Sequence, residues 1–168
     1  MFEDQADAVE RYAAAGIGIG KVQVSSAVVL NLDELAIADR RPALGQLRGF
    51  HEDRYLHQTC VRSTAGAEPS FFEDLPWALQ TVEDGRTLQG QWRVHFHVPI
   101  YVERCGWLST SQSDIGACLQ AVRRCPELRH FEIETYAWTV LPEALRQATL
   151  AEGIAAEIRW FQTLLSDR

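Results

Sequence analysis

The chain has 168 residues, a formal net charge of −7 and a hydrophobic fraction of 46%. This length predicts one domain with its own core, and the acidic balance argues against a broad nucleic-acid-binding surface. No apolar stretch approaches the roughly 20 residues that span a bilayer, and no two of the four cysteines form a Cys-x-x-Cys pair, so we expect a cytoplasmic protein with reduced thiols and no direct membrane insertion.

The first part of the chain predicts two helices and two strands. Residues 3–15 are rich in alanine and place apolar side chains at helical spacing. β-Branched residues after a run of glycines predict a strand over 20–28. Residues 32–48 predict a partial helix that Pro42 interrupts, and residues 54–62 predict a second strand.

The second part continues with alternating elements. Residues 71–84 predict one or two short helical turns, and residues 91–101 predict a third strand. Residues 109–128 begin with capping residues and continue as an amphipathic helix. Residues 129–140 predict a fourth strand, and a long last helix is predicted from 141 onward.

This order of elements favours an α/β fold with parallel strands, because helices alternate with strands along most of the chain. The strands over 55–62 and 92–101 lack a clear full-length helix between them. The sequence therefore also predicts that these two strands form an antiparallel hairpin inserted into the α/β frame.

Titratable side chains gather on one face of the third and fourth strands. Alternation puts Arg93, His95, His97 and Tyr101 on one face of the third strand, away from its apolar residues. The same rule groups the following residues of the fourth strand: His130, Glu132, Glu134, Tyr136 and Trp138. Buried histidines and carboxylates would suit a metal or acid–base chemistry. On a solvated face they would be surface or structural residues, and the strand pattern leaves both open.

Four stretches carry a resemblance to a known family: GIGIGKVQVSSA, RYLHQTCVR, WRVHFHVPIY and HFEIETYAWTVLP. Together they resemble the C-terminal part of the EboE-type metabolite traffic proteins, which are similar to xylose isomerases and sugar-phosphate isomerase/epimerases. The resemblance implies that residues 1–168 form a single partial domain, the C-terminal part of a xylose isomerase-like TIM barrel whose upstream strands are absent. Strands 20–28 and 130–138 would be the last two strands of that barrel.

The resemblance also implies a site. Glu134 would hold a divalent metal (Zn, Mn or Mg). The segment with His95 and His97 has no clear equivalent in the simple isomerases, and we expect these two histidines to carry the chemistry together with Glu134. His57 would face the two histidines across the hairpin. Substrate contacts would come from Gln23, Ser25, His57, Arg93, Tyr136 and Trp138.

Two functions follow as expectations. The first is an isomerase- or epimerase-type enzyme that acts on a small polar metabolite with a divalent metal in the full-length barrel. The alternative is a non-catalytic member that binds and hands on a metabolite in the pathway of a secondary metabolite. A metal-dependent nuclease is a weaker option, since the chain is acidic. A homodimer, or association with the missing half of the barrel, would cover the open strand edges.

Overall fold

The computed structural model describes residues 1–64, 67–83, 88–135 and 138–166. Its helices are α1 (Gln5–Ala14), α2 (Ile37–Arg48), α3 (Leu75–Glu83), α4 (Gln112–Val122) and α5 (Leu150–Ser166), with short 3-10 turns at Leu32–Glu34 and Glu143–Leu145. Its strands are β1 (Lys21–Val24), β2 (Ser26–Asn31), β3 (Thr59–Arg62), β4 (Ser70–Phe72), β5 (Gln91–Val98), β6 (Arg104–Cys105), β7 (Leu108–Thr110) and β8 (His130–Ile133).

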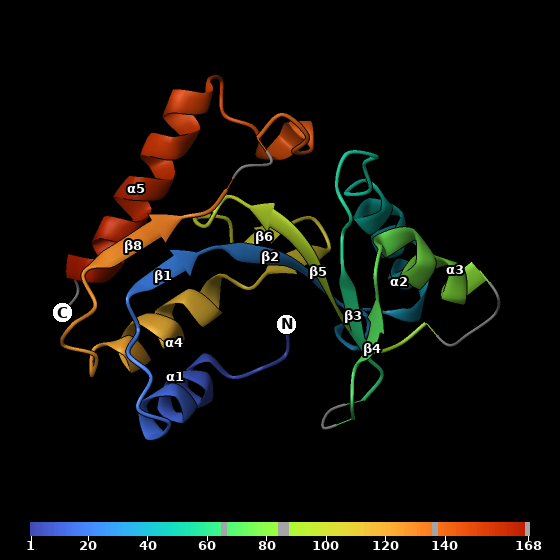
Figure 1. The fold of residues 1–168 in the computed structure, drawn as a ribbon. Coiled ribbons are helices and arrows are strands. Elements are labelled where there is room, and N and C mark those ends of the chain that lie inside the picture. Colours follow the sequence, from blue (N-terminus) through green and yellow to red (C-terminus); the bar gives the residue numbers. More distant parts are fainter. Residues whose placement is uncertain (65–66, 84–87, 136–137, 167–168) are drawn as a thin grey trace.

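The strands form two sheets that meet at Ser25. The larger sheet has six strands in the order β4-β3-β5-β2-β7-β6, and all of its ladders are antiparallel. The smaller sheet pairs β1 with β8 in parallel. Because β1 and β2 are separated by Ser25 alone, one nearly continuous segment passes from the small sheet into the large one (Figure 1).

The TIM-barrel prediction is therefore wrong. A barrel of that kind consists of parallel strands, each followed by a helix, whereas the main sheet here is antiparallel throughout. The physical reason lies in the connections. Parallel neighbours need a crossover of a dozen or more residues, but only Gly106 and Trp107 separate β6 from β7, and Gly106 adopts φ 61° in that turn.

The expected antiparallel pairing of the second and third strands does occur, between β3 and β5. The prediction that they form an inserted hairpin is nevertheless wrong, since both strands lie inside the main sheet, with β5 between β3 and β2. Strand β3 is also shorter than expected. The carboxylate of Glu52 accepts hydrogen bonds from the backbone N–H groups of Arg54 and Tyr55, which holds a turn where the sequence predicted strand.

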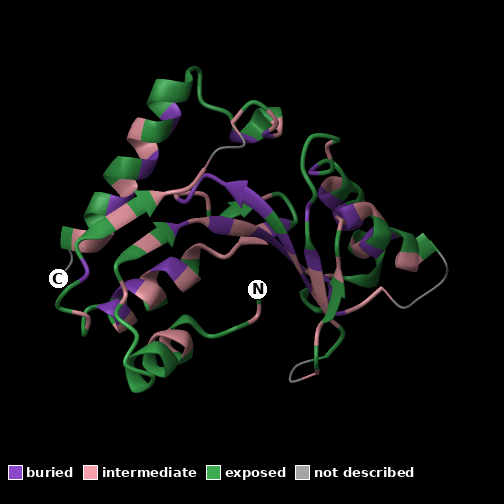
Figure 2. Ribbon diagram, in the orientation of Figure 1, coloured by how far each residue is buried: buried purple, intermediate pink, exposed green. Residues whose placement is uncertain are grey.

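Helices cover both sheets. The main core lies between α2, α3 and the large sheet, where these elements carry buried segments (Figure 2). Trp92, Val94 and Phe96 of β5 belong to this core. A second core joins β1 and β8 to α4 and α5, which lie on opposite sides of this strand pair (Figure 1). Helix α1 packs against α4. The Arg93 and His95 face of β5 thus points away from the main core, toward α4 and the N-terminal segment.

Helix α5 contains a glycine because an indole ring packs against it. The ring of Trp138 lies so close to Gly153 that a Cβ atom at that position would overlap it. We expect Gly153→Ala to lower the free energy of unfolding by about 2 kcal/mol, as overpacking of a core does. Gly116→Ala in α4 is the matched control. An added Cβ there meets nothing within 4 Å, and we expect a gain of about 0.5–1 kcal/mol.

Chemical denaturation of the two variants beside the parent chain measures both effects. Equal stability changes in the two alanine variants would show that helix propensity, and not the Trp138 contact, governs position 153.

Candidate functional site

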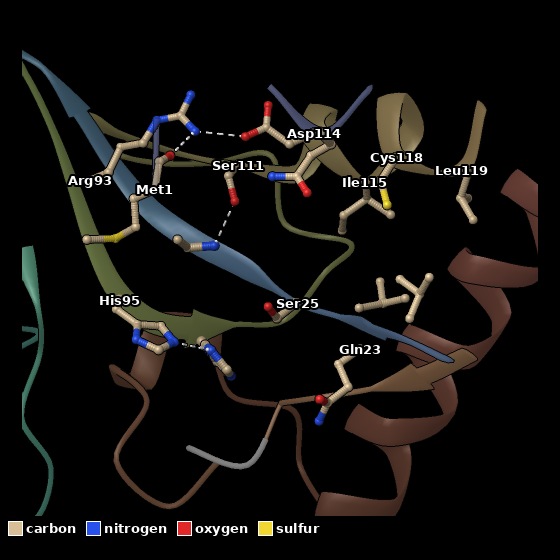
Figure 3. Close-up of a pocket in the computed structure, with 15 residues that line it drawn as sticks. Met1, Gln23, Ser25, Arg93, His95, Ser111, Asp114, Ile115, Cys118 and Leu119 are labelled. Atoms are coloured by element: carbon tan, nitrogen blue, oxygen red, sulfur yellow. Dashed lines mark hydrogen bonds and ion pairs between the residues drawn. The ribbon is translucent and has the colours of Figure 1, made fainter. Parts of the chain in front are cut away.

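A pocket of about 270 Å³ lies where the two sheets meet, between β1, β2, β5, α4 and the N-terminal segment. Figure 3 shows Arg93, Asp114 and Met1 grouped at one end of it, with Ser25 between this group and Gln23. Its wall is formed by Met1, Gln5, Val22, Gln23, Val24, Ser25, Ala27, Arg93, His95, His97, Ser111, Asp114, Ile115, Cys118 and Leu119.

A bulge in β5 shapes the wall that carries the histidines. Ala27 pairs with His97 while the next residue, Val28, pairs with Val94, so His95 and Phe96 are extra residues opposite β2. Such bulges bend a strand and redirect its side chains. Here Phe96 stays in the main core, and both histidines face the pocket. The sequence prediction that Arg93, His95 and His97 share a face of the strand is confirmed for this part of β5.

The two imidazole rings are hydrogen-bonded to each other. Nε2 of His95 lies 2.8 Å from Nε2 of His97, and Nδ1 of His97 lies 2.7 Å from the carbonyl oxygen of Glu134. A carbonyl oxygen only accepts, so His97 Nδ1 must donate its proton to Glu134. In the neutral pair His97 Nε2 is then an acceptor, and His95 Nε2 donates to it.

The surroundings favour a neutral His97. Its side chain is 5% exposed, and this burial lowers its pKa below the ordinary value. The charge that His95 takes on when protonated lowers the pKa of His97 further, while the contacts with Glu134 raise it. His95, by contrast, is exposed. The pair therefore combines a buried, oriented imidazole with one that solvent and a ligand reach.

Arg93 crosses the end of the pocket nearest the start of α4. Its Nη1 donates to Asp114 Oδ2 at 2.8 Å and to the carbonyl oxygen of Met1 at 2.8 Å. The first turn of α4 is joined to β2 in the same region. The N–H of Ala27 donates to Ser111 Oγ at 2.9 Å, and the N–H of Ser111 donates to the carbonyl of Ala27 at 2.9 Å.

The structure brings five of the predicted site residues to the pocket: Gln23, Ser25, Arg93, His95 and His97. His57 lies elsewhere. Its ring centre is 4.9 Å from that of Phe96, on the core side of β5, and its Nε2 is 3.5 Å from Glu52 Oε1. It does not face the histidine pair across a hairpin, because β3 and β5 lie side by side in one sheet.

Glu134 makes its hydrogen bond to the site through its backbone, and its carboxylate acts on His97 through its charge. Its carbonyl oxygen orients His97, whereas its carboxylate is not part of the pocket wall. Trp138, expected to contact substrate, packs against the main core and Gly153 instead. Tyr136, the remaining predicted contact, lies outside the described residues.

The donor atoms do not fit the metal site that the family resemblance implies. That site needs the Glu134 carboxylate beside further carboxylate or imidazole ligands, and this carboxylate does not reach the pocket. Over the described ranges there is no group of three or more His, Cys, Asp or Glu residues that could hold a metal ion. The divalent metal stays a prediction from sequence.

Sequence reasoning missed Asp114, Ser111 and Met1. Acidic and hydroxyl residues at the start of a helix are normally explained by capping and the helix dipole, so Ser111 and Asp114 gave no separate signal. The role of Met1 depends on where the N-terminal segment lies, which no local pattern encodes.

Cys118 also lines the pocket, and burial raises its pKa, which keeps it a thiol and a poor nucleophile.

Comparisons with protein-family models, with curated proteins and with solved structures each give no match. Within the described part of the chain, every helix is too short or too polar to cross a membrane.

Proposed function

We propose that this chain binds a small polar metabolite in the pocket and transfers a proton to or from it through His95 and His97. The hydrogen bond between the two Nε2 atoms, with His97 oriented by the Glu134 carbonyl, is the observation that carries the proposal. Proton transfer at the carbon next to a carbonyl is one route by which sugars are isomerised or epimerised, so this reaction agrees with the isomerase or epimerase class that the resemblance implies and does not need its barrel. We also propose that the protein is located in the cytoplasm.

The hydrogen-bond directions assign a role to each ring. When His95 Nε2 donates to His97, the lone pair left on His95 is that of Nδ1, which serves as the base. A proton taken up at Nδ1 makes His95 an imidazolium, and its Nε2–H remains bonded to the neutral His97. His97 thus stabilises the charged intermediate, and its own second proton is disfavoured by burial.

Polar groups beside this pair would orient the ligand. Ser25 and Gln23 line the pocket with hydroxyl and amide groups, and Val24, Ile115 and Leu119 supply apolar wall. A site with a few polar groups on a mostly apolar wall is typical of small-molecule binding.

Binding without chemistry is the second candidate, and one observation favours it. Apart from the histidine pair, the acidic and thiol groups on the pocket wall are Asp114, already paired with Arg93, and Cys118, kept as a thiol by burial. A second catalytic acid is therefore not evident among the described residues, and the pocket would serve a carrier equally well.

Proton exchange in heavy water separates the two candidates. Dihydroxyacetone, xylulose and xylose are incubated with the full chain in D₂O, and loss of the C–H signals next to the carbonyl is followed by proton NMR. We expect exchange above the buffer rate, and a loss of about 100-fold or more in His95→Gln, the range in which general bases contribute.

His130→Gln is the matched control, because His130 is exposed on β8 and does not line the pocket. It should exchange at the parent rate. Ligand signals that broaden or shift without any exchange would favour the carrier function, and equal exchange in parent chain, His95→Gln and buffer would exclude the enzyme.

A further inference from the structure

The first four residues form a strap across one end of the pocket. Residues 1–4, called the N-terminal strap here, lead into α1, where the Asp4 side chain accepts hydrogen bonds from the N–H groups of Ala6 and Asp7. Met1 and Gln5 line the pocket. The strap is therefore anchored at the start of α1 and contacts Arg93 through Met1.

Two arginine side chains, Arg62 and Arg93, hold residues 1 and 2 of the strap. The guanidinium Cζ atoms of Arg62 and Arg93 lie 4.2 Å and 5.0 Å from the centre of the Phe2 ring. The carbonyl oxygen of Met1 accepts from Arg93 Nη1. These contacts lie at a partly exposed position, where a cation–π contact contributes only about 0.5–1 kcal/mol, and all of them end on arginine side chains of the sheet.

Arg93 has donors to spare. A guanidinium offers five N–H donors, and every hydrogen bond that Arg93 makes to the described residues uses Nη1. Its Nε is buried without a hydrogen-bond partner among those residues, although the side chain as a whole is 18% exposed. The Nε–Nη2 edge is the edge that binds a carboxylate with two parallel hydrogen bonds.

Arg93 is also the single Lys or Arg side chain on the described wall of the pocket. Asp114 engages a different nitrogen, so no described residue accepts a hydrogen bond from the Nε–Nη2 edge. A buried donor without an acceptor is unfavourable, and a ligand oxygen that reaches it removes that penalty.

We propose that Arg93 is the anchor for a carboxylate group on the ligand of this pocket, and that the N-terminal strap covers this anchor until the ligand displaces it. This inference rests on the proposed function, which supplies a ligand for the pocket. What is new is that the ligand carries a carboxylate and that the N-terminal strap gates its access to Arg93. While the strap is closed, the Met1 carbonyl accepts from Arg93 Nη1 beside Asp114, and the Phe2 ring lies against the guanidinium groups of Arg62 and Arg93.

Lactate and its neutral analogue lactamide are the probes. Their affinities for the full chain are measured by NMR titration of the Arg93 Hε and histidine ring signals. We expect lactate to bind at least 10-fold more tightly than lactamide, and Arg93→Lys to lose about 10-fold for lactate alone, because Lys keeps the charge but not the two-point geometry. The control is Arg123, an exposed arginine that directly follows α4. Arg123→Gln should leave both affinities unchanged.

Phe2→Ala tests the strap while leaving the anchor intact. Removing the ring should open the strap, raise lactate affinity about five-fold, and speed the solvent exchange of Arg93 Hε without any ligand, since a covered site binds in proportion to its open fraction. Unchanged or weaker lactate binding in Phe2→Ala would overturn the gate. Equal binding of lactate and lactamide, or tighter binding of inorganic phosphate than of lactate, would overturn the carboxylate anchor.

The two proposals fail in different ways. If the neutral ketoses exchange protons while lactate does not bind, the proposed function stands and the carboxylate anchor is wrong. If lactate binds through Arg93 and no compound exchanges protons, the anchor stands and the chain is a carrier.

Discussion

Replacing Glu157 with Ala is expected to lower the free energy of unfolding by about 2–4 kcal/mol at pH 7. The Glu157 side chain on α5 is 1% exposed, and its Oε1 accepts from the N–H of Ile100 at 3.0 Å and from Thr135 Oγ1 at 2.6 Å. Each donor left buried without an acceptor costs about 1–3 kcal/mol, and the cavity adds to that loss. The carboxylate thereby ties α5 to the segments that follow β5 and β8.

Glu157→Gln separates the acceptor from the charge. Burial raises the pKa of Glu157, so the folded chain keeps the proton at pH values where the unfolded chain has lost it. Stability from this group is present below the unfolded pKa and is lost as the pH rises through the folded one. Gln keeps an acceptor oxygen without the charge, so we expect it to stay within about 1 kcal/mol of the parent and to gain relative to it as pH rises.

Urea unfolding of both variants at pH 5 and pH 8 measures these effects. Glu152→Ala is the control on the same helix, since Glu152 is exposed, and its loss should stay below about 1 kcal/mol. A Gln variant as unstable as the Ala variant would mean that the negative charge itself is required.

Acidification from pH 7.5 to 5 is expected to destabilise the fold through two buried histidines. Burial is the largest cause that lowers the pKa of His57 and of His97. His57 has Glu52 and Asp74 near it, which raise its pKa, and His51, which lowers it. In both cases the unfolded chain binds the proton more tightly than the folded one.

The sign follows from proton linkage. Between the folded and unfolded pKa values the unfolded state holds more protons, so stability falls as pH drops below about 6.5 and keeps falling until the folded pKa is passed. For each unit by which the folded-state pKa lies below the unfolded one, the free energy of unfolding falls by about 1.4 kcal/mol once the pH is below both pKa values. Because Glu157 acts in the opposite direction, the cleanest measurement uses urea unfolding in the Glu157→Gln background.

His97→Gln should reduce the fall in the free energy of unfolding between pH 6.5 and pH 5. His130→Gln, at an exposed position, should leave that fall unchanged. A profile that is flat between pH 7.5 and 5 in the Glu157→Gln background would contradict the role of both buried histidines.

Local patterns were sufficient for much of the secondary structure. The apolar spacing of residues 3–15 predicted α1, and the two-residue alternation around His95 and His97 predicted their shared face. Pro42 was expected to interrupt its helix, yet α2 runs through it from Ile37 to Arg48. Propensity is overridden there because Ala43, Leu44 and Leu47 are buried in the main core.

Local patterns did not give the topology. Alternating helices and strands favoured a parallel sheet, but strand direction depends on which strands pair, and the sequence does not state that order. The resemblance to barrel proteins carried the same assumption, and the antiparallel main sheet overturned it. His57 shows the consequence, since its side of β5 could be assigned only once β3 was known to be a neighbour of β5 in the sheet.

By itself the sequence determined that the chain has a strand with two histidines on one face, because side-chain alternation is a local property of the backbone. The tertiary structure decided what surrounds them. It placed the Glu134 carbonyl, and not its carboxylate, on His97, and it brought Asp114 and Met1 to Arg93. Along the sequence, these partners are separated by 21 to 92 residues from the residues whose side chains they contact. Contacts over such distances depend on strand order and helix packing, which short-range periodicity does not encode.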